Sequence, residues 1–298
     1  MSERFKVIIA YTLICLIWGS TWLVIKLGTT TLTPWLGAGI RFAVSVVILF
    51  GIIKYRGIEI PWTPAAKKFY FNVSFFSFTV PFALVYWGAQ YIPSGLSSVL
   101  FGTYPFSVAI FSYLFLKEEK LTVSKIAGIV FGFSGVLVIF ANDLRTNSEY
   151  ALFGMAATVV SAMMQAYSVI IIKKHANDIS PFVTLMMPMV FGMFFLLGGS
   201  LLFEHYETVH FTFPAIVGIL YLSIFGTILT FVSYFWLLKK TAPVILSLTA
   251  FITPVIAVTL GVLLNHEQFS PEKYIGAAIV LAGILIANGE EIRDALVK

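Results

Sequence analysis

Residues 94–116 read SGLSSVLFGTYPFSVAIFSYLFL, a run without a single charged side chain. A helix that crosses the hydrocarbon layer of a membrane needs about 20 mostly apolar residues, and this run is long enough. Pro105 stands in its middle, where a proline removes one backbone hydrogen bond and kinks the helix. The run therefore predicts a kinked transmembrane helix.

Further apolar runs of similar length lie on both sides of this one. They are Val7–Ile25, Pro34–Ile53, Phe69–Gly88, Val123–Ala141, Tyr150–Ile172, Pro181–Phe203, Pro214–Leu238, Ala242–Leu264 and Glu272–Asn288. The runs are continuously apolar and do not alternate every second residue, so they predict helices and not a transmembrane barrel. The first run is too long for a signal peptide. We therefore expect an all-α polytopic membrane protein with ten transmembrane helices.

The composition excludes most other classes of protein. Apolar residues make up 59% of the 298 residues and charged residues only 11%, against roughly a quarter in a soluble domain. The lack of charge excludes a disordered chain, and the single Cys15 excludes a disulfide scaffold. The net charge of +5 reflects the loops of a membrane protein and gives no indication of a nucleic-acid partner.

The basic residues are distributed unevenly between the loops. If both termini are cytoplasmic, most of the 19 Lys and Arg residues fall on the inner side. These include the pairs Lys67-Lys68, Lys173-Lys174 and Lys239-Lys240, whereas the outer loops carry Glu204 and Glu207. Cytoplasmic loops of multi-pass proteins have this basic excess. The pattern therefore predicts cytoplasmic termini.

The second half of the chain repeats the first. Tyr104-Pro105, followed by Lys117-Glu118-Glu119, corresponds to Thr253-Pro254, followed by His266-Glu267. The repeat divides the chain into residues 1–143 and 144–298. Because each unit has five spans, an odd number, the second five-helix repeat is expected to be inverted relative to the first. Inverted repeats are typical of secondary transporters, which bind substrate near the midplane between them.

Several motifs in the first half stand in a characteristic order. They are Trp18-Gly19-Ser20-Thr21-Trp22 followed by Lys26, then Arg41-Phe42, then Pro105 with Lys117-Glu118-Glu119-Lys120-Leu121-Thr122, and then a helix with Gly128 and Gly135. Together they resemble the EamA-type transporters of the drug/metabolite transporter (DMT) superfamily, over the whole chain. The resemblance implies an inner-membrane permease, usually an exporter of amino acids or other small metabolites. The halves differ, however, since no arginine stands opposite Arg41 in the second half.

Helical spacing places candidate site residues on two spans. Trp18, Trp22 and Lys26 share one face of the first span. We expect Trp18 to line a cavity, Trp22 to anchor at the membrane interface and Lys26 to be solvated. In the sixth span, Gln165 and Ser168 belong to a polar stripe. The Gln165 amide is expected to bind either a neighbouring helix or the substrate.

Arg41 is the most informative single residue. It lies about seven residues into its span, roughly 10 Å deep at about 1.5 Å per residue. A charge there costs about 3 kcal/mol unless it is solvated or paired, and no Asp or Glu lies inside any expected span. Arg41 is therefore either a structural residue held by carbonyls and aromatic rings or an attractor for a substrate carboxylate. By the family resemblance, the missing acid also disfavours a proton-driven exporter of cationic drugs.

Tyr86 and Gln90 end the third span, and Tyr104 stands across the outer loop from them. The candidate substrate-binding residues are therefore Trp18, Arg41, Tyr86, Gln90, Tyr104, Gln165 and Ser168. Pro105 and Pro254 are the candidate hinges, because a mid-helix proline weakens the helix. Gly128-x-x-x-Gly132 is interpreted as a helix-packing motif away from the substrate.

Three classes of function remain. A transporter that works by alternating access is favoured by the inverted repeat and the polar stripes. A membrane-embedded lipid-modifying enzyme and a non-transporting assembly component are the alternatives. The spans hold no metal-ligand cluster, nucleophile elbow or paired acids, so we expect no catalytic residue, metal or cofactor. The expected partners are a small-molecule substrate and the lipid bilayer, and the identity of the substrate stays open.

Overall fold

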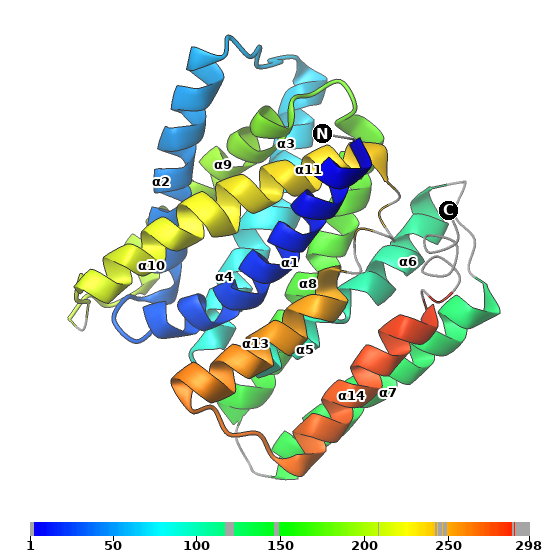
Figure 1. The fold of residues 1–298 in the computed structure, drawn as a ribbon. Coiled ribbons are helices and arrows are strands. Elements are labelled where there is room, and N and C mark those ends of the chain that lie inside the picture. Colours follow the sequence, from blue (N-terminus) through cyan, green and yellow to red (C-terminus); the bar gives the residue numbers. More distant parts are fainter. Residues whose placement is uncertain are drawn as a thin grey trace.

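A computed structural model describes residues 3–116, 122–145, 149–207, 209–241, 243, 246, 249–287 and 289. Every element among these residues is a helix, and the helices form one bundle (Figure 1). The first half contains α1 (Glu3–Gly28), α2 (Pro34–Tyr55), α3 (Pro64–Val73), the π-helix η1 (Ser74–Thr79), α4 (Val80–Ala89), α5 (Ser94–Phe101), α6 (Tyr104–Phe115) and α7 (Val123–Arg145). The second half contains α8 (Glu149–His175), α9 (Pro181–Phe203), α10 (Phe213–Ser223), the π-helix η2 (Ile224–Leu229), α11 (Thr230–Lys240), α13 (Thr249–Asn265) and α14 (Pro271–Ala287).

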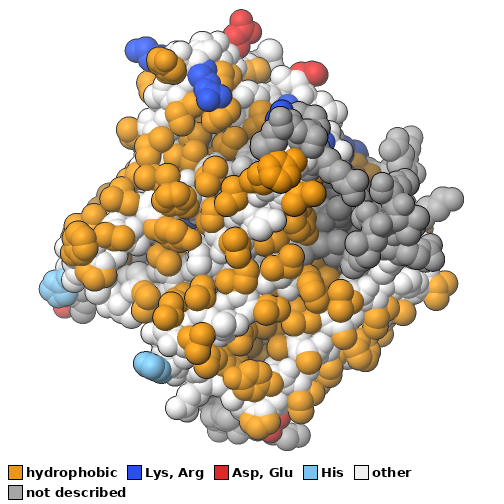
Figure 2. Space-filling view, viewed as in Figure 1, with side chains coloured by type: hydrophobic (Ala, Val, Ile, Leu, Met, Phe, Trp, Pro, Cys, Tyr) orange, Lys and Arg blue, Asp and Glu red, His pale blue; other side chains and the backbone are white. Residues whose placement is uncertain are grey.

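The length and composition of these helices suit a membrane. In the described part of the chain, 8 helical stretches are long and apolar enough to cross one, and α13 is a shorter apolar helix. Apolar side chains cover most of the face seen in Figure 2, while the visible Lys and Arg side chains gather near the end that holds the N-terminus. The all-helical, membrane-spanning fold expected from the sequence is confirmed. The motif Lys117-Glu118-Glu119 and Asn288, the last residue of the tenth expected span, lie outside the described residues.

Among the described residues, three of the spans are interrupted α-helices. Two contain a π-helical turn, η1 between α3 and α4 and η2 between α10 and α11. The span that starts at Ser94 is broken at Gly102 and Thr103, just before Pro105. Pro254, in contrast, lies within the continuous helix α13. The two candidate hinges therefore have different local structures.

Carboxylates in the loops cap the N-termini of two helices. Glu204 accepts hydrogen bonds from the backbone N–H groups of Trp35 (2.8 Å) and Leu36 (3.1 Å) at the start of α2. Glu267 accepts them from Ser94 (2.9 Å) and Gly95 (3.1 Å) at the start of α5. An acidic group at this position accepts hydrogen bonds from otherwise unpaired N–H donors and interacts favourably with the positive end of the helix dipole.

Two lysines cap helix C-termini in an equivalent way. The Nζ of Lys26, at the end of α1, donates to the carbonyl oxygens of Ala89 (2.7 Å) and Gln90 (3.1 Å), where α4 ends. The Nζ of Lys173, near the end of α8, donates to the carbonyls of Leu238 (2.6 Å) and Thr241 (2.9 Å), where α11 ends. The prediction that Lys26 is merely solvated is therefore wrong, because its charge serves unpaired carbonyls of a neighbouring helix.

Helices α7 and α14 lie side by side at the edge of the bundle (Figure 1). Their backbones meet at glycines. A Cβ atom on Gly283 would lie 2.5 Å from the Cα of Gly132, and one on Gly135 would lie 2.6 Å from the carbonyl oxygen of Gly276. Gly128 is equally close to the backbone of α14. The packing role predicted for Gly128 and Gly132 is confirmed.

Candidate functional site

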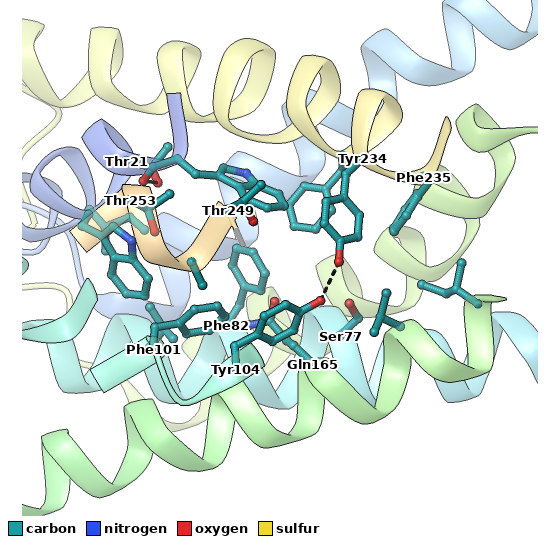
Figure 3. A pocket seen from close by; sticks show the side chains of 18 of the residues that line it. Thr21, Ser77, Phe82, Phe101, Tyr104, Gln165, Tyr234, Phe235, Thr249 and Thr253 are labelled. Atoms are coloured by element: carbon teal, nitrogen blue, oxygen red, sulfur yellow. Dashed lines mark hydrogen bonds between the residues drawn. The ribbon is translucent and has the colours of Figure 1, made fainter. Parts of the chain in front are cut away.

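A cavity lies inside the bundle, between residues of both halves of the chain (Figure 3). About 100 Å³ of it is open to the centres of water-sized molecules, whereas one buried water needs roughly 10–15 Å³. The cavity therefore has room for several waters or a small solute. Its lining residues are Trp18, Thr21, Trp22, Ile25, Arg41, Ser77, Phe82, Val85, Phe101, Tyr104, Gln165, Val169, Ile172, Phe231, Tyr234, Phe235, Thr249, Ala250 and Thr253.

Aromatic rings make up much of the cavity wall. The Trp18 ring contacts those of Phe231 and Tyr234, with centroids 5.2 and 5.3 Å apart. Phe101 stacks on Tyr104 at 5.6 Å. The hydroxyl groups of Tyr104 and Tyr234 lie 2.7 Å apart and form a hydrogen bond between the two halves of the chain (Figure 3). Such walls suit a solute with an apolar or aromatic part.

Arg41 brings a positive charge to this cavity from α2. Its side chain is 2% exposed. Its Nε donates to the hydroxyl of Thr227 (2.8 Å), one Nη to the carbonyl of Gly226 (3.0 Å), and the other to the hydroxyl of Tyr86 (3.3 Å). Its guanidinium carbon lies 5.0 Å from the centroid of the Phe82 ring. The partners are thus a carbonyl, two hydroxyls and an aromatic face, and none of them neutralises the charge.

The π-helix η2 makes this arrangement possible. Both Gly226 and Thr227 belong to η2, and the Thr227 hydroxyl donates in turn to the carbonyl of Leu222 (2.8 Å). A π turn widens the helix and changes which backbone and side-chain groups face a neighbour, and such turns occur often at functional sites. Ser77, in the other π-helix, lines the same cavity. The π-helix η1 therefore contributes directly to the cavity wall, whereas η2 contributes by holding Arg41.

Gln165 supplies an amide from α8. Its Nε2 donates to the hydroxyl of Ser161 (3.2 Å), which donates to the backbone carbonyl of Pro81 (3.1 Å) on α4. The amide is therefore held within its own helix, and the side chain lines the cavity. Of the two roles expected for Gln165, this bond is not one to a neighbouring helix, and contact with the substrate stays a prediction. The helix-to-helix bond is made by Ser161.

The structure brings together four of the predicted substrate-binding residues: Trp18, Arg41, Tyr104 and Gln165 all line the cavity. Tyr86 contacts it through Arg41. Gln90 lies apart, exposed at the end of α4, and its Nε2 donates to the carbonyl of Trp87 (3.2 Å). Ser168 is fully buried but is not among the lining residues.

Other residues of the cavity were not expected from the sequence. Trp22, predicted to be an interfacial anchor, instead lines the cavity and contacts the Phe101 ring at 5.3 Å. Thr249 and Thr253 contribute hydroxyl groups from α13. A small hydroxyl side chain in a span carries little signal, because it packs equally well between helices. The spacing of Trp22 from Trp18 was the available signal for a shared face.

The bundle of apolar helices, with its internal cavity and the buried cation of Arg41, is that of a polytopic membrane protein. The EamA-like transporter family matches the chain twice, over residues 5–141 and residues 152–289. The chain therefore belongs to the EamA-like transporter family, as the motifs predicted, and is a multi-pass membrane transporter.

Similar proteins cover nearly the whole chain. The uncharacterized transporter YoaV of Bacillus subtilis is 29% identical over 94% of this chain and 96% of its own length. The protein PagO of Salmonella typhimurium is 28% identical over 87% of this chain and 84% of its own, and the uncharacterized inner membrane transporter YedA of Escherichia coli is 24% identical over 92% and 88%. A crystal structure of another protein matches with a TM-score of 0.70 at 18% identity, covering 96% of this chain and 98% of that one, which shows a shared fold.

Proposed function

We propose that the protein is a secondary transporter that exports small metabolites, such as amino acids or their derivatives, across the inner membrane by alternating access. The observation that carries this proposal is the buried Arg41 on a cavity between the two halves. A charge in the membrane interior is costly and is typical of a substrate pathway. Transporters of this plan bind substrate at such an interface.

The cavity chemistry supports a substrate class. Three of the five N–H groups of the Arg41 guanidinium bind neutral protein groups, so a carboxylate can bind the two that remain and compete for the other three. No Asp or Glu is among the lining residues. The aromatic wall suits an apolar side chain, and Gln165 offers an amide. We assign the cavity to a small amphipathic solute that carries a carboxylate.

The proposed architecture is ten transmembrane helices in two inverted five-helix repeats, residues 1–143 and 144–298. The double match to the family supports it. So do the equivalent features of the two halves: the π-helices η1 and η2, and the lysine caps made by Lys26 and Lys173. Basic side chains gathered near the N-terminal end of the bundle support cytoplasmic termini (Figure 2).

Alternating access requires contacts between the halves that can break and re-form. The hydrogen bond between Tyr104 and Tyr234 is one such contact, and the bonds from Arg41 to Thr227 and Gly226 are others. A substrate carboxylate at Arg41 would compete with these neutral partners. We propose that the break before Pro105 acts as a hinge, and that Pro254 plays the corresponding part in α13.

The function is tested by measuring the flux of radiolabelled amino acids across proteoliposomes that contain the purified protein. We expect flux that saturates with substrate concentration and is faster than in protein-free liposomes. Arg41→Gln should reduce it, while the matched change Arg56→Gln, on the exposed end of α2, should not. Flux equal to that of empty liposomes across a broad metabolite panel would contradict transport and favour an enzyme or an assembly component. Export is tested by comparing inverted with right-side-out vesicles.

A further inference from the structure

Two further spaces each share at least one lining residue with the central cavity. A larger space of about 560 Å³ lies among the end of α1, the start of α2, α4 and α10. A much smaller one of about 10 Å³ lies among the ends of α8 and α11 and the start of α9. We call them the outer and the inner chamber, after the proposed orientation of the termini. The inner chamber holds no more than about one water molecule.

The central cavity shares a lining isoleucine with each chamber. Ile25 of α1 lines both the outer chamber and the cavity. Ile172 of α8 lines both the inner chamber and the cavity. The two occupy equivalent places in the halves, since each directly precedes its capping lysine, Lys26 or Lys173. Each isoleucine is nearly fully buried, with 5% and 4% of its surface exposed.

An aromatic side chain stands beside each isoleucine. Tyr86 of α4 lines the outer chamber and binds Arg41 through its hydroxyl. Phe235 of α11 lines both the cavity and the inner chamber, and it lies at the opposite end of the cavity from Thr21 (Figure 3). Both rings are 3% exposed. A pair of apolar side chains of this size blocks a polar solute, because a solute that passes must lose its hydration.

We propose that the three spaces form one translocation path, with Ile25 and Tyr86 as its outer gate and Ile172 and Phe235 as its inner gate. The outer chamber is then a second solute site. Its lining combines the hydroxyl groups of threonines such as Thr29 and Thr31 with apolar side chains such as Leu222, which suits an amphipathic solute. The proposal rests on the proposed transport function and adds where the solute enters and leaves the cavity.

The difference in volume between the chambers points to how the gates work. The outer chamber has room for many waters and the inner one for about one, so the inner end of the path is packed and the outer end is open as far as Ile25. The outer gate also contains the Arg41–Tyr86 bond, which Phe235 cannot reproduce because it lacks a hydroxyl group. A substrate carboxylate that takes the Nη group of Arg41 would release Tyr86 and loosen the outer gate.

Thiol labelling tests the gates without knowledge of the substrate. The native cysteine is removed by Cys15→Ala, and Ser77→Cys places a reporter thiol in the cavity of the full-length protein. A charged, membrane-impermeant methanethiosulfonate is added to either side of sealed vesicles. Thr30→Cys and Asn177→Cys, both exposed and each on one chamber, show separately which side of the membrane reaches which chamber.

We expect Ile25→Ala to speed labelling of the reporter about ten-fold from the side that labels position 30, because the lost carbons lower the cost of opening the wall. Ile172→Ala should do the same from the side that labels position 177. The matched controls Ile14→Ala and Ile170→Ala, buried isoleucines of α1 and α8 that line neither the cavity nor a chamber, should change nothing. Valine replaces alanine at any site where the alanine variant does not elute as folded protein.

Equal acceleration by the control variants, labelling from the wrong side, or no change in folded gate variants would each overturn the assignment of the gates. Substrate flux is measured on the same preparations. Side-specific labelling in a protein without flux would contradict the proposed function and leave the path in place. Flux without side-specific labelling would contradict the path alone.

Discussion

Replacement of Arg41 by glutamine gives the sharpest test of the substrate class. Three of the five N–H groups of the guanidinium are used by Thr227, Tyr86 and Gly226, at 2.8, 3.3 and 3.0 Å. The side chain is 2% exposed, so water screens its positive charge weakly. A solute that enters the cavity therefore experiences this charge. Glutamine keeps an amide that can bind the same carbonyl and removes the charge. We expect the Arg41→Gln protein to stay folded in the membrane.

The expected loss of affinity follows from the bond that disappears. A hydrogen bond to a charged group contributes about 1.5–3 kcal/mol, and loss of one therefore weakens binding of a carboxylate roughly ten- to a hundred-fold. A neutral amide analogue of the same substrate should be far less affected, because it does not carry the charge that Arg41 attracts. Arg41→Lys keeps the charge but loses the planar fork, so its effect should be intermediate.

A double-mutant cycle isolates this interaction. The dissociation constants of acid and amide are measured by isothermal titration calorimetry on wild-type and Arg41→Gln protein, after a thermal-shift screen has supplied a ligand. The coupling free energy is the difference between the two effects of the mutation. A coupling near zero, in protein that elutes as a folded species, would make Arg41 purely structural and would refute a carboxylate substrate.

The remaining predictions concern topology, the cavity and helix packing. Tyr206→Cys should label from the outside only, and labelling from the cytoplasm alone would reverse the orientation. Tyr104→Cys and Gln165→Cys should be protected from thiol reagents by substrate; full transport with no labelling in any state would place them outside the path. Gly283→Ala should lower the free energy of unfolding by about 1–3 kcal/mol and reduce Tm, because it overpacks α7 against α14. The control Gly51→Ala, with no atom within 4 Å of its new Cβ, should leave Tm unchanged. Equal Tm values for the two variants would contradict the packing.

Much of the fold could be read from the sequence because the membrane imposes simple rules. Every backbone polar group in the hydrocarbon layer needs a partner, so long apolar runs predict helices with little ambiguity. The close packing at Gly128 followed from the small-residue spacing, and the burial of Arg41 from its depth in a span. Four of the residues predicted to bind substrate line the cavity, and their role in binding stays a prediction.

The rest depends on tertiary contacts that no local pattern encodes. The partners of Arg41 at Gly226 and Thr227 lie far along the chain and are presented by a π turn, which has no distinctive sequence signal. Lys26 was assigned to solvent because its acceptors, the last carbonyls of α4, belong to another helix. The prediction for Trp22 was wrong for a related reason. Tryptophan is common both at membrane interfaces and in binding sites, and the contact with Phe101 that places Trp22 on the cavity is a tertiary contact.

The way in which Arg41 is solvated bears directly on selectivity. A buried carboxylate partner would have formed an ion pair with Arg41, and both charges would then have had to be desolvated. The pair would also have neutralised the site and left little electrostatic attraction for a ligand. Hydroxyls, a carbonyl and a ring face instead lower the cost of burying the guanidinium while the site keeps its net charge. A ligand that brings its own carboxylate supplies the missing counter-charge, whereas a cation would meet repulsion with no acid on the cavity wall to offset it. Because the described lining residues include no Asp or Glu, we expect the cavity to favour a solute with a carboxylate and to disfavour cationic drugs.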